Sequence, residues 1–261
     1  MNEKLTITPD GRTTLHMERR LPHPPAKVWR AITEPEHLAR WFPAEMHIDG
    51  DKVSYGFGPD GVVTRNDSPR VLAHTWGQDE LRWELRPDGD GTVLIFTHTF
   101  ADRYGAASFA AGWHTCIAGL GALLAGRQTR LPADTAHLHE HYVAILGLTS
   151  GTVKDGVVRL ERQLTRPAEE VWQALDGDQV TVGAPPPAPF AIPGPPAGPV
   201  TRAEAAKLLE YGTQDGTVHW ELTTGTGHGA RLIITQTGDT STLPAWRARI
   251  EDLAVTLASS R

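Results

Sequence analysis

Two stretches of this chain resemble each other closely: residues 15–32 read LHMERRLPHPPAKVWRAI, and residues 158–175 read VRLERQLTRPAEEVWQAL. They align without gaps, with identical residues at seven of the 18 positions. Both begin with alternating apolar residues, which predict a strand, and continue past a proline with Val and Trp at helical spacing. Pro25 suits the first turn of a helix, where its missing N–H costs nothing. The chain therefore repeats a strand-then-helix opening.

Two further blocks recur in the same order. Residues 63–65 and 200–202 both read VTR, and WEL occurs at 83–85 and again at 220–222. Near the end of each half, a tryptophan and three apolar residues share one helix face: Trp113, Ile117, Leu120 and Leu124, then Trp246, Ile250, Leu253 and Leu257. Ordered repeats of this kind indicate a duplicated domain. We predict two domains, residues 1–150 with an extension helix at the C-terminal end and residues 151–261 with a proline-rich loop.

Length and composition agree with two globular domains. The 261 residues are 39% hydrophobic and 21% charged, with a formal net charge of −6. Because no Lys/Arg run interrupts this acidic balance, we expect no nucleic-acid partner. The single cysteine, Cys116, excludes an internal disulfide and a multi-cysteine zinc site. The N-terminus lacks the apolar core of a signal peptide, and the apolar run 116–125 is about half a membrane span. These features predict a cytoplasmic protein without a membrane partner.

The order of elements predicts the fold of the first domain. Helices are expected from residue 25 and over 37–42, with a long helix through 109–124. Between residues 46 and 100, short alternating runs separated by Gly/Asp turns predict an antiparallel meander. Sheet in one block and helix at the end indicate an α+β fold, in which a curved antiparallel sheet wraps a long C-terminal helix. This helix-grip arrangement leaves room for a cavity between helix and sheet.

The second domain departs from the first in its middle. Eight of the 20 prolines lie in 185–199, which predicts a loop or polyproline II arm in place of the short second helix. We therefore expect a ligand cavity in the first domain and a smaller or filled one in the second, with Phe190 and Ile192 as the residues that could fill it. The linker contains a further expected helix, in which Leu138, Tyr142 and Ile145 share a face.

Five pieces of the first domain occur in the order of a known family. They are PPAKVWRAIT at 24–33, HLARWF at 37–42, VLAHTW at 71–76, GTVLIFTH at 91–98 and GW at 112–113. In these pieces, residues 12–126 resemble the activators of the heat-shock protein 90 ATPase (C-terminal domain type), within the START-like or SRPBCC superfamily. The second domain looks like a degenerate START-like member. The resemblance implies the helix-grip fold already expected from the pattern of elements.

The resemblance also implies a range of functions. Family members mostly bind hydrophobic small molecules or proteins in or around the cavity, and a minority of the superfamily are cyclases or hydrolases. We predict non-enzymatic binding of a hydrophobic small molecule, or an apolar peptide segment, in the first domain, with a stress-related role. The alternatives are a co-chaperone-like ATPase activator acting through protein interaction, and a cyclase- or hydrolase-type enzyme. A protein partner or a homodimer is also expected.

The predicted ligand-binding residues are aromatic, with two histidines and one isoleucine. They are Trp41, Phe42, Trp76, Trp83, Phe96, His98, Phe109, Trp113, His114 and Ile117. Such side chains suit an apolar pocket with a few polar groups, although the same aromatics could form ordinary core. His98 and His114 could orient a ligand or act as a general base, and the alternative is a hydrogen-bonded interior role.

Other candidate chemistry is weaker. His137 and His141 share a helix face at i, i+4, but a third metal ligand would have to come from elsewhere, so a solvated face is favoured. Cys116 is expected to be a buried, inert thiol. The sequence contains no glycine-rich phosphate loop and no GxSxG motif. We therefore predict no catalytic residue, no metal and no cofactor.

Overall fold

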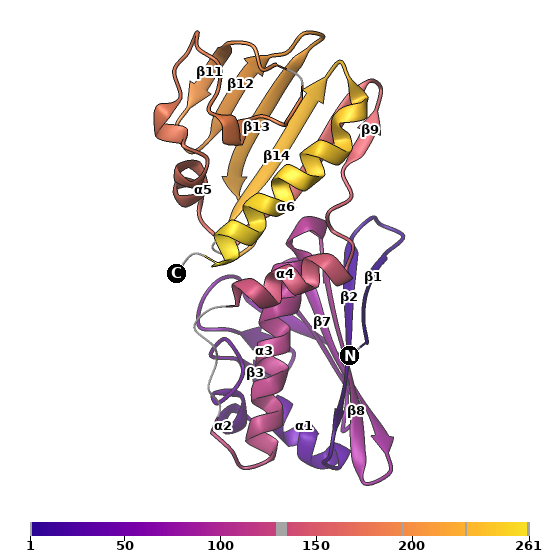
Figure 1. Ribbon diagram of the computed structural model, residues 1–261. Coiled ribbons are helices and arrows are strands. Elements are labelled where there is room, and N and C mark those ends of the chain that lie inside the picture. The colour runs from indigo at the N-terminus through magenta and orange to yellow at the C-terminus, as the bar shows by residue number, and fades with distance from the viewer. Residues whose placement is uncertain (1, 129–134, 195, 228, 260–261) are drawn as a thin grey trace. The chain divides into compact units, whose positions relative to one another are not determined.

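The computed structural model describes residues 2–128, 135–194, 196–227 and 229–259 (Figure 1). Contacts divide the chain into two compact units. The first unit is residues 1–106 with 110–133, and the second unit is residues 107–109 with 134–261. This division falls between residues 133 and 134, whereas the sequence placed the boundary at 150. The difference arises because the helix after residue 135 packs on the second unit.

The first unit contains eight strands in one antiparallel sheet, in the order β1-β2-β8-β7-β6-β5-β4-β3. The strands are β1 Asn2–Ile7, β2 Thr13–Leu21, β3 His47–Asp49, β4 Lys52–Ser54, β5 Gly61–Asp67, β6 Val71–Trp76, β7 Asp79–Asp88 and β8 Gly91–Phe100. The helices are α1 Pro25–Thr33, α2 Pro35–Leu38, a 3-10 turn at Arg103–Gly105 and α3 Ala106–Leu124. Figure 1 shows α3 laid across the sheet, which is the helix-grip arrangement expected from the sequence.

Alternation in β8 determines which side chains face α3. Every second residue of this strand is buried, including Leu94, Phe96 and His98. Trp113 and Leu120 on α3 are buried as well. The core of the first unit therefore lies between two layers: the central strands around β8 and the apolar face of α3.

The second unit contains six strands in the order β11-β12-β13-β14-β10-β9. They are β9 Thr152–Lys154, β10 Val157–Gln163, β11 Val200–Glu204, β12 Leu208–Gly212, β13 Thr217–Thr224 and β14 Ala230–Thr237. The helices are α4 Ala136–Ile145, α5 Ala168–Ala174, three 3-10 turns at Gly177–Gln179, Ala188–Phe190 and Thr240–Thr242, and α6 Leu243–Ser259. Read from β9, this order repeats that of the first unit without strands equivalent to β3 and β4. The two units therefore share a strand order, and the internal duplication stays a prediction.

One local expectation was wrong, and one strand was missed. The second helix of the first unit is Pro35–Leu38 rather than 37–42, because Pro35 begins the helix instead of breaking the chain. Strand β1 was not predicted. The helix expected in the linker is present as α4, where Tyr142 and His139 are buried and Ile145 is 48% exposed.

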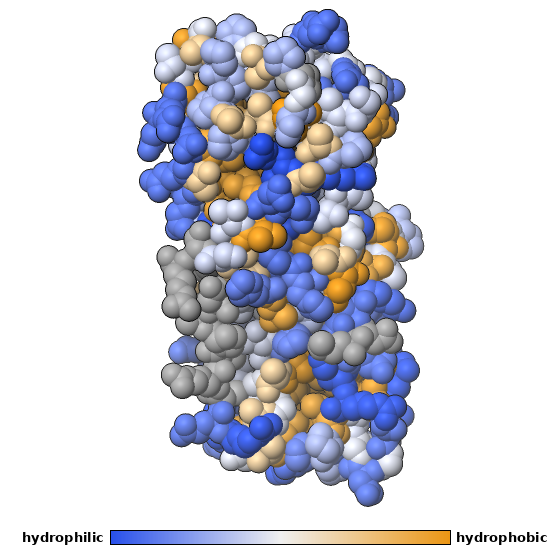
Figure 2. All heavy atoms as spheres, viewed as in Figure 1, coloured by the Kyte–Doolittle hydropathy of each residue, from blue (hydrophilic) through white to orange (hydrophobic). Residues whose placement is uncertain are grey.

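One described helical segment is long and apolar enough to cross a membrane by length and composition, namely Arg103–Leu124, which begins earlier than the apolar run seen in the sequence. Of its most apolar 18 residues, 56% are buried within the protein, which is typical of a core helix. On the face shown in Figure 2, hydrophobic residues form separate patches among hydrophilic ones. These features describe an α+β fold with one apolar core helix.

Candidate functional site

Five of the predicted aromatic residues pack ring against ring in the first unit. The ring centroid of Trp83 lies 4.3 Å from Phe96, 5.6 Å from Trp41 and 5.7 Å from Trp113. Phe42 lies 5.9 Å from Trp113. Separations of this size give direct, mostly tilted or edge-to-face contacts. The inner part of the predicted site is therefore a packed aromatic cluster.

The cluster continues outward to the surface through Trp76. This ring stacks on Phe42 at 6.2 Å and on Tyr55 at 4.2 Å, and it lies 5.7 Å from Phe57. Trp76 is half-buried, and Phe57 is 60% exposed. We call Phe42, Tyr55, Phe57 and Trp76 the aromatic mouth. It is an unbroken aromatic path from the core of the unit to solvent.

Sequence reasoning missed Tyr55 and Phe57. Both lie in the loop after β4, where each is followed by a glycine with positive φ, 73° at Gly56 and 71° at Gly58. Glycine adopts this conformation readily, so the loop turns sharply while presenting two aromatic rings. Two aromatics interleaved with glycines were a signal in the sequence for an exposed aromatic loop.

His98 is held between the long helix and a neighbouring strand. Trp113 Nε1 donates to His98 Nδ1 at 3.1 Å, and His98 Nε2 lies 2.9 Å from Asp79 Oδ2. An indole N–H is a donor only, so Nδ1 must accept and the ring proton resides on Nε2, directed to the carboxylate. A general base needs an unoccupied nitrogen facing its substrate. This geometry favours the hydrogen-bonded interior role for His98.

A second buried histidine, His74, was missed as a polar member of this core. Trp83 Nε1 lies 3.4 Å from His74 Nε2, and His74 Nδ1 lies 2.6 Å from the Tyr55 hydroxyl. Tyr55 in turn donates to the carbonyl of Thr75. Burial lowers the pKa of His74 to about 4 and raises the pKa of Tyr55. Both side chains are neutral at pH 7 and fix the orientation of rings in the cluster.

The remaining predicted residues are on α3 and occupy different settings. Ile117 is buried, whereas Phe109 and His114 are half-buried. Phe109 falls in residues 107–109, which contacts assign to the second unit. The sequence grouped Phe109 with the first domain because it continues the stripe of Trp113. Cys116 is buried, and burial raises the pKa of its thiol to about 11, as expected of an inert cysteine.

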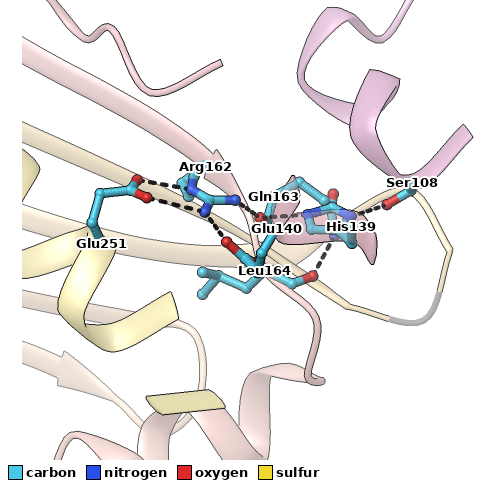
Figure 3. Close-up of polar contacts among 7 residues, drawn as sticks. All are labelled: Ser108, His139, Glu140, Arg162, Gln163, Leu164 and Glu251. Carbon is cyan, nitrogen blue, oxygen red and sulfur yellow. Dashed lines mark hydrogen bonds and ion pairs between the residues drawn. The ribbon is translucent and has the colours of Figure 1, made fainter. Parts of the chain in front are cut away.

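Figure 3 shows a buried polar cluster in the second unit. Arg162 on β10, with a side chain 2% exposed, contacts Glu140 on α4 and Glu251 on α6. Beside it, Ser108 Oγ lies 3.2 Å from His139 Nδ1, and His139 Nε2 lies 3.3 Å from the carbonyl of Gln163. These contacts attach α4 to the sheet of the second unit.

Ser108 and His139 lie close enough to form a nucleophile–base pair, but the pKa of the histidine is too low for a general base. Burial, reinforced by the charge of Arg162, lowers the pKa of His139 to about 4. A histidine with so low a pKa is too weak a base to accept the hydroxyl proton of a serine effectively at neutral pH. His137 and His141 are exposed on the opposite side of α4. The described part of the chain contains no group of three residues arranged to hold a metal ion.

The hollows lined by described residues lie away from the predicted residues. In the first unit, one of about 120 Å³ is lined by Lys27, Arg30, Ala31, His37, Arg40, Leu123 and Leu124. In the second unit, Phe190 of the arm is fully buried and fills part of the space between helix and sheet, as expected. A cavity of about 150 Å³ nevertheless remains beside it, bordered by Ile192 and Trp246. It is not smaller than the described hollow of the first unit, so the expected order of cavity sizes was wrong.

The comparison with protein families concerns the first unit. Residues 22–125 match the family described as "Activator of Hsp90 ATPase homolog 1-like protein". This segment of the chain resembles that family, and the unit around it has the helix-grip arrangement. Among proteins with curated descriptions, none matches the chain at a significant level.

Several solved structures are similar to parts of this chain at low identity. CalU16 from Micromonospora echinospora is 22% identical, with a TM-score of 0.47 over 55% of this chain and 95% of its own. EF2215 from Enterococcus faecalis, a conserved protein of unknown function, is 19% identical, with a TM-score of 0.49 over 55% and 90%. DynU16, from the dynemicin biosynthetic locus, is 17% identical, with a TM-score of 0.42 over 94% and 96%.

Proposed function

We propose that the first unit binds a hydrophobic small molecule, or an apolar peptide segment, without catalysing a reaction on it. The observation that carries this proposal is the aromatic mouth, which exposes Phe57 and part of Trp76 at the end of a buried aromatic cluster. A flat apolar ligand that inserts between these rings would bury aromatic surface on both of its faces. At about 25 cal/mol per Å² of apolar area, such burial supplies most of the binding free energy.

The polar groups near the rings support binding rather than turnover. His98 is engaged at both ring nitrogens, and His74 is neutral in its buried position. Neither histidine pairs with a nucleophilic serine, threonine or cysteine in the contacts described above. The family match supports a ligand-binding or co-chaperone-like role in general, and the cytoplasmic location stays a prediction.

Binding of N-phenyl-1-naphthylamine, a neutral apolar fluorophore, tests the proposal. Its fluorescence should rise on addition of the protein, and Trp76→Ala should weaken binding at least five-fold. The matched control is Trp29→Ala, which removes another half-buried tryptophan of the first unit from α1. Equal affinity in both variants and the parent protein would contradict a site at the aromatic mouth. Native mass spectrometry of the purified protein should then identify any co-purified ligand by mass.

The family description favours one alternative, a co-chaperone-like ATPase activator. An exposed Phe57 beside Trp76 would serve equally well as an apolar anchor for a partner protein. The two roles differ in their response to a small probe. A partner that competes with N-phenyl-1-naphthylamine and loses affinity in Phe57→Ala, while no small molecule co-purifies, would favour the protein-interaction role.

A further inference from the structure

The cavity of about 150 Å³ in the second unit has a buried floor and an exposed rim. Its floor includes Trp246 from α6, Tyr211 from β12 and Val218 from β13, each at most 2% exposed. The proline-rich arm closes another side through Ile192 and Ala197. In other proteins a cavity of about this size holds one benzene ring. The space therefore suits a single six-membered ring.

Several polar hydrogens of the buried lining are already donated within the protein. Tyr211 donates its hydroxyl to the carbonyl of Phe190 at 2.9 Å, and Trp246 Nε1 donates to Gln236 Oε1. Thr242 donates to Gln236 Oε1 or to the carbonyl of Asp239, at 3.1 and 2.9 Å. Gln236 donates one amide hydrogen to the carbonyl of Asp239, while Thr213 and Gln214 add further side-chain donors at the rim. The hydroxyl oxygens keep lone pairs, so the lining also offers acceptors.

The charge at the rim favours a cationic ligand. Asp215 and Asp239 both border the opening and are exposed, and no Lys, Arg or His lies among the described lining residues. Ser241 donates its backbone N–H to Asp239 Oδ1, and hydrogen bonding by the side chain and the backbone of Ser241 lowers the pKa of this carboxyl and keeps it ionised. On α6, Arg249 donates to the carbonyl of Ala191, a lining residue of the arm, and this bond occupies its guanidinium outside the lining. An anionic ligand would meet two carboxylates here, whereas a cation would be attracted.

We propose that this cavity is a binding site for a small organic amine, with a single ring in the cavity and its ammonium group at the carboxylate rim. The ring packs against Trp246 and Val218, and the ammonium donates to the oxygens of Asp215 and Asp239. This site is independent of the aromatic mouth, because all of its residues belong to the second unit. The second unit is then a binding domain in its own right.

Three probes of equal ring size test the charge preference: benzylamine, benzyl alcohol and benzoate. Titrations of the full-length protein are followed by the indole N–H signals of its tryptophans in two-dimensional NMR, with Trp246→Phe prepared to assign one signal. Benzylamine should shift the Trp246 signal and bind more tightly than benzyl alcohol, and benzoate should bind at least ten-fold more weakly than benzylamine. Benzoate binding as well as benzylamine, or no shift of Trp246 with benzylamine, would overturn the proposal.

Variants locate the site. Asp215→Asn should weaken benzylamine about two- to five-fold, as for an exposed charge pair, and leave benzyl alcohol unchanged. Asp252→Asn, an exposed acid elsewhere on α6, is the matched control and should leave both probes unchanged. Ala197→Phe fills the cavity from the half-exposed arm and Val218→Leu from the sheet. Each should abolish binding in a protein with a cooperative melting transition, and unchanged binding in either folded variant would refute the site.

Discussion

Trp113 on α3 donates its indole N–H to Nδ1 of His98 on β8, 3.1 Å away, and so joins the long helix of the first unit to the middle of its sheet. The second unit makes the same connection between Trp246 and Gln236. A glutamine amide accepts a hydrogen bond as an imidazole nitrogen does, but it has no titration near neutral pH. Both units therefore place a hydrogen-bond acceptor for the indole N–H at this position, so the role of His98 is to bind the helix to the sheet.

This relationship predicts how His98 tolerates substitution. His98→Gln should keep the acceptor for Trp113 and change the free energy of unfolding by less than about 1 kcal/mol. His98→Leu leaves the buried indole N–H without a partner and should cost about 1–3 kcal/mol. Urea denaturation of both variants measures the difference. A glutamine variant as unstable as the leucine variant would show that the acceptor is not what matters.

Acid should destabilise both units through their buried histidines. His74 and His139 each have a pKa lowered from 6.5 to about 4, chiefly by burial. Their neutral forms are favoured in the folded state, so their contribution is fully present above pH 6.5. It is lost as the pH falls from 6.5 toward 4, because the unfolded chain takes up the protons first. Each group can account for at most about 3 kcal/mol.

Denaturation at a series of pH values checks this expectation. The parent protein should lose stability between pH 6.5 and 4, and His74→Gln should flatten that loss while lowering stability at pH 7. His141→Gln, an exposed histidine of α4, is the control and should follow the parent curve. If His74→Gln keeps the full pH dependence, other groups are responsible for it.

The architecture was predictable from the sequence because the internal repeat and the alternation of apolar residues in the strands both reflect it. Strand β8 alternates buried and half-buried side chains over its whole length, and the Trp113 stripe has helical spacing, so local pattern and tertiary packing agree there. Strand β1 escaped prediction because the alternation in Leu5 and Ile7 is weak, and β1 becomes a strand by pairing with β2. The partner strand, rather than local propensity, determines such an edge.

The candidate site was harder to predict. Trp41, Trp83 and Phe96 were grouped correctly from their apolar character, but sequence gives no measure of whether rings leave a void or fill it. Here they fill it. Tyr55 and Phe57 reach Trp76 from a loop whose path depends on two glycines. The cavity of the second unit depends on where the proline-rich arm runs, which no periodic pattern specifies.

Replacement of Trp113 should affect ligand binding more than replacement of its neighbour. Trp113→Ala removes a ring that contacts Phe42, Trp83 and Phe96, and should weaken N-phenyl-1-naphthylamine more than His114→Ala does. A buried aromatic ring contributes a few kcal/mol by area, whereas one neutral hydrogen bond contributes about 1 kcal/mol. Since Trp113→Ala should also cost about 3–5 kcal/mol of stability, titrations are made below the melting transition of each variant. If His114→Ala abolished turnover of a substrate but not its binding, the non-enzymatic proposal would fail.

The charges around Arg162 should be mutually dependent. Arg162→Met leaves Glu140 and Glu251 facing each other without their cation and should cost about 3–5 kcal/mol, since Arg162 is almost fully buried. Glu251→Gln should cost less than about 1 kcal/mol, because that side chain is 40% exposed and Glu140 still pairs with the arginine. The triple variant Arg162→Met, Glu140→Gln, Glu251→Gln removes every charge and should be more stable than Arg162→Met alone. Urea denaturation of the three proteins measures this order. A triple variant no more stable than the single one would mean that Arg162 acts through the packing of its side chain and not through its charge.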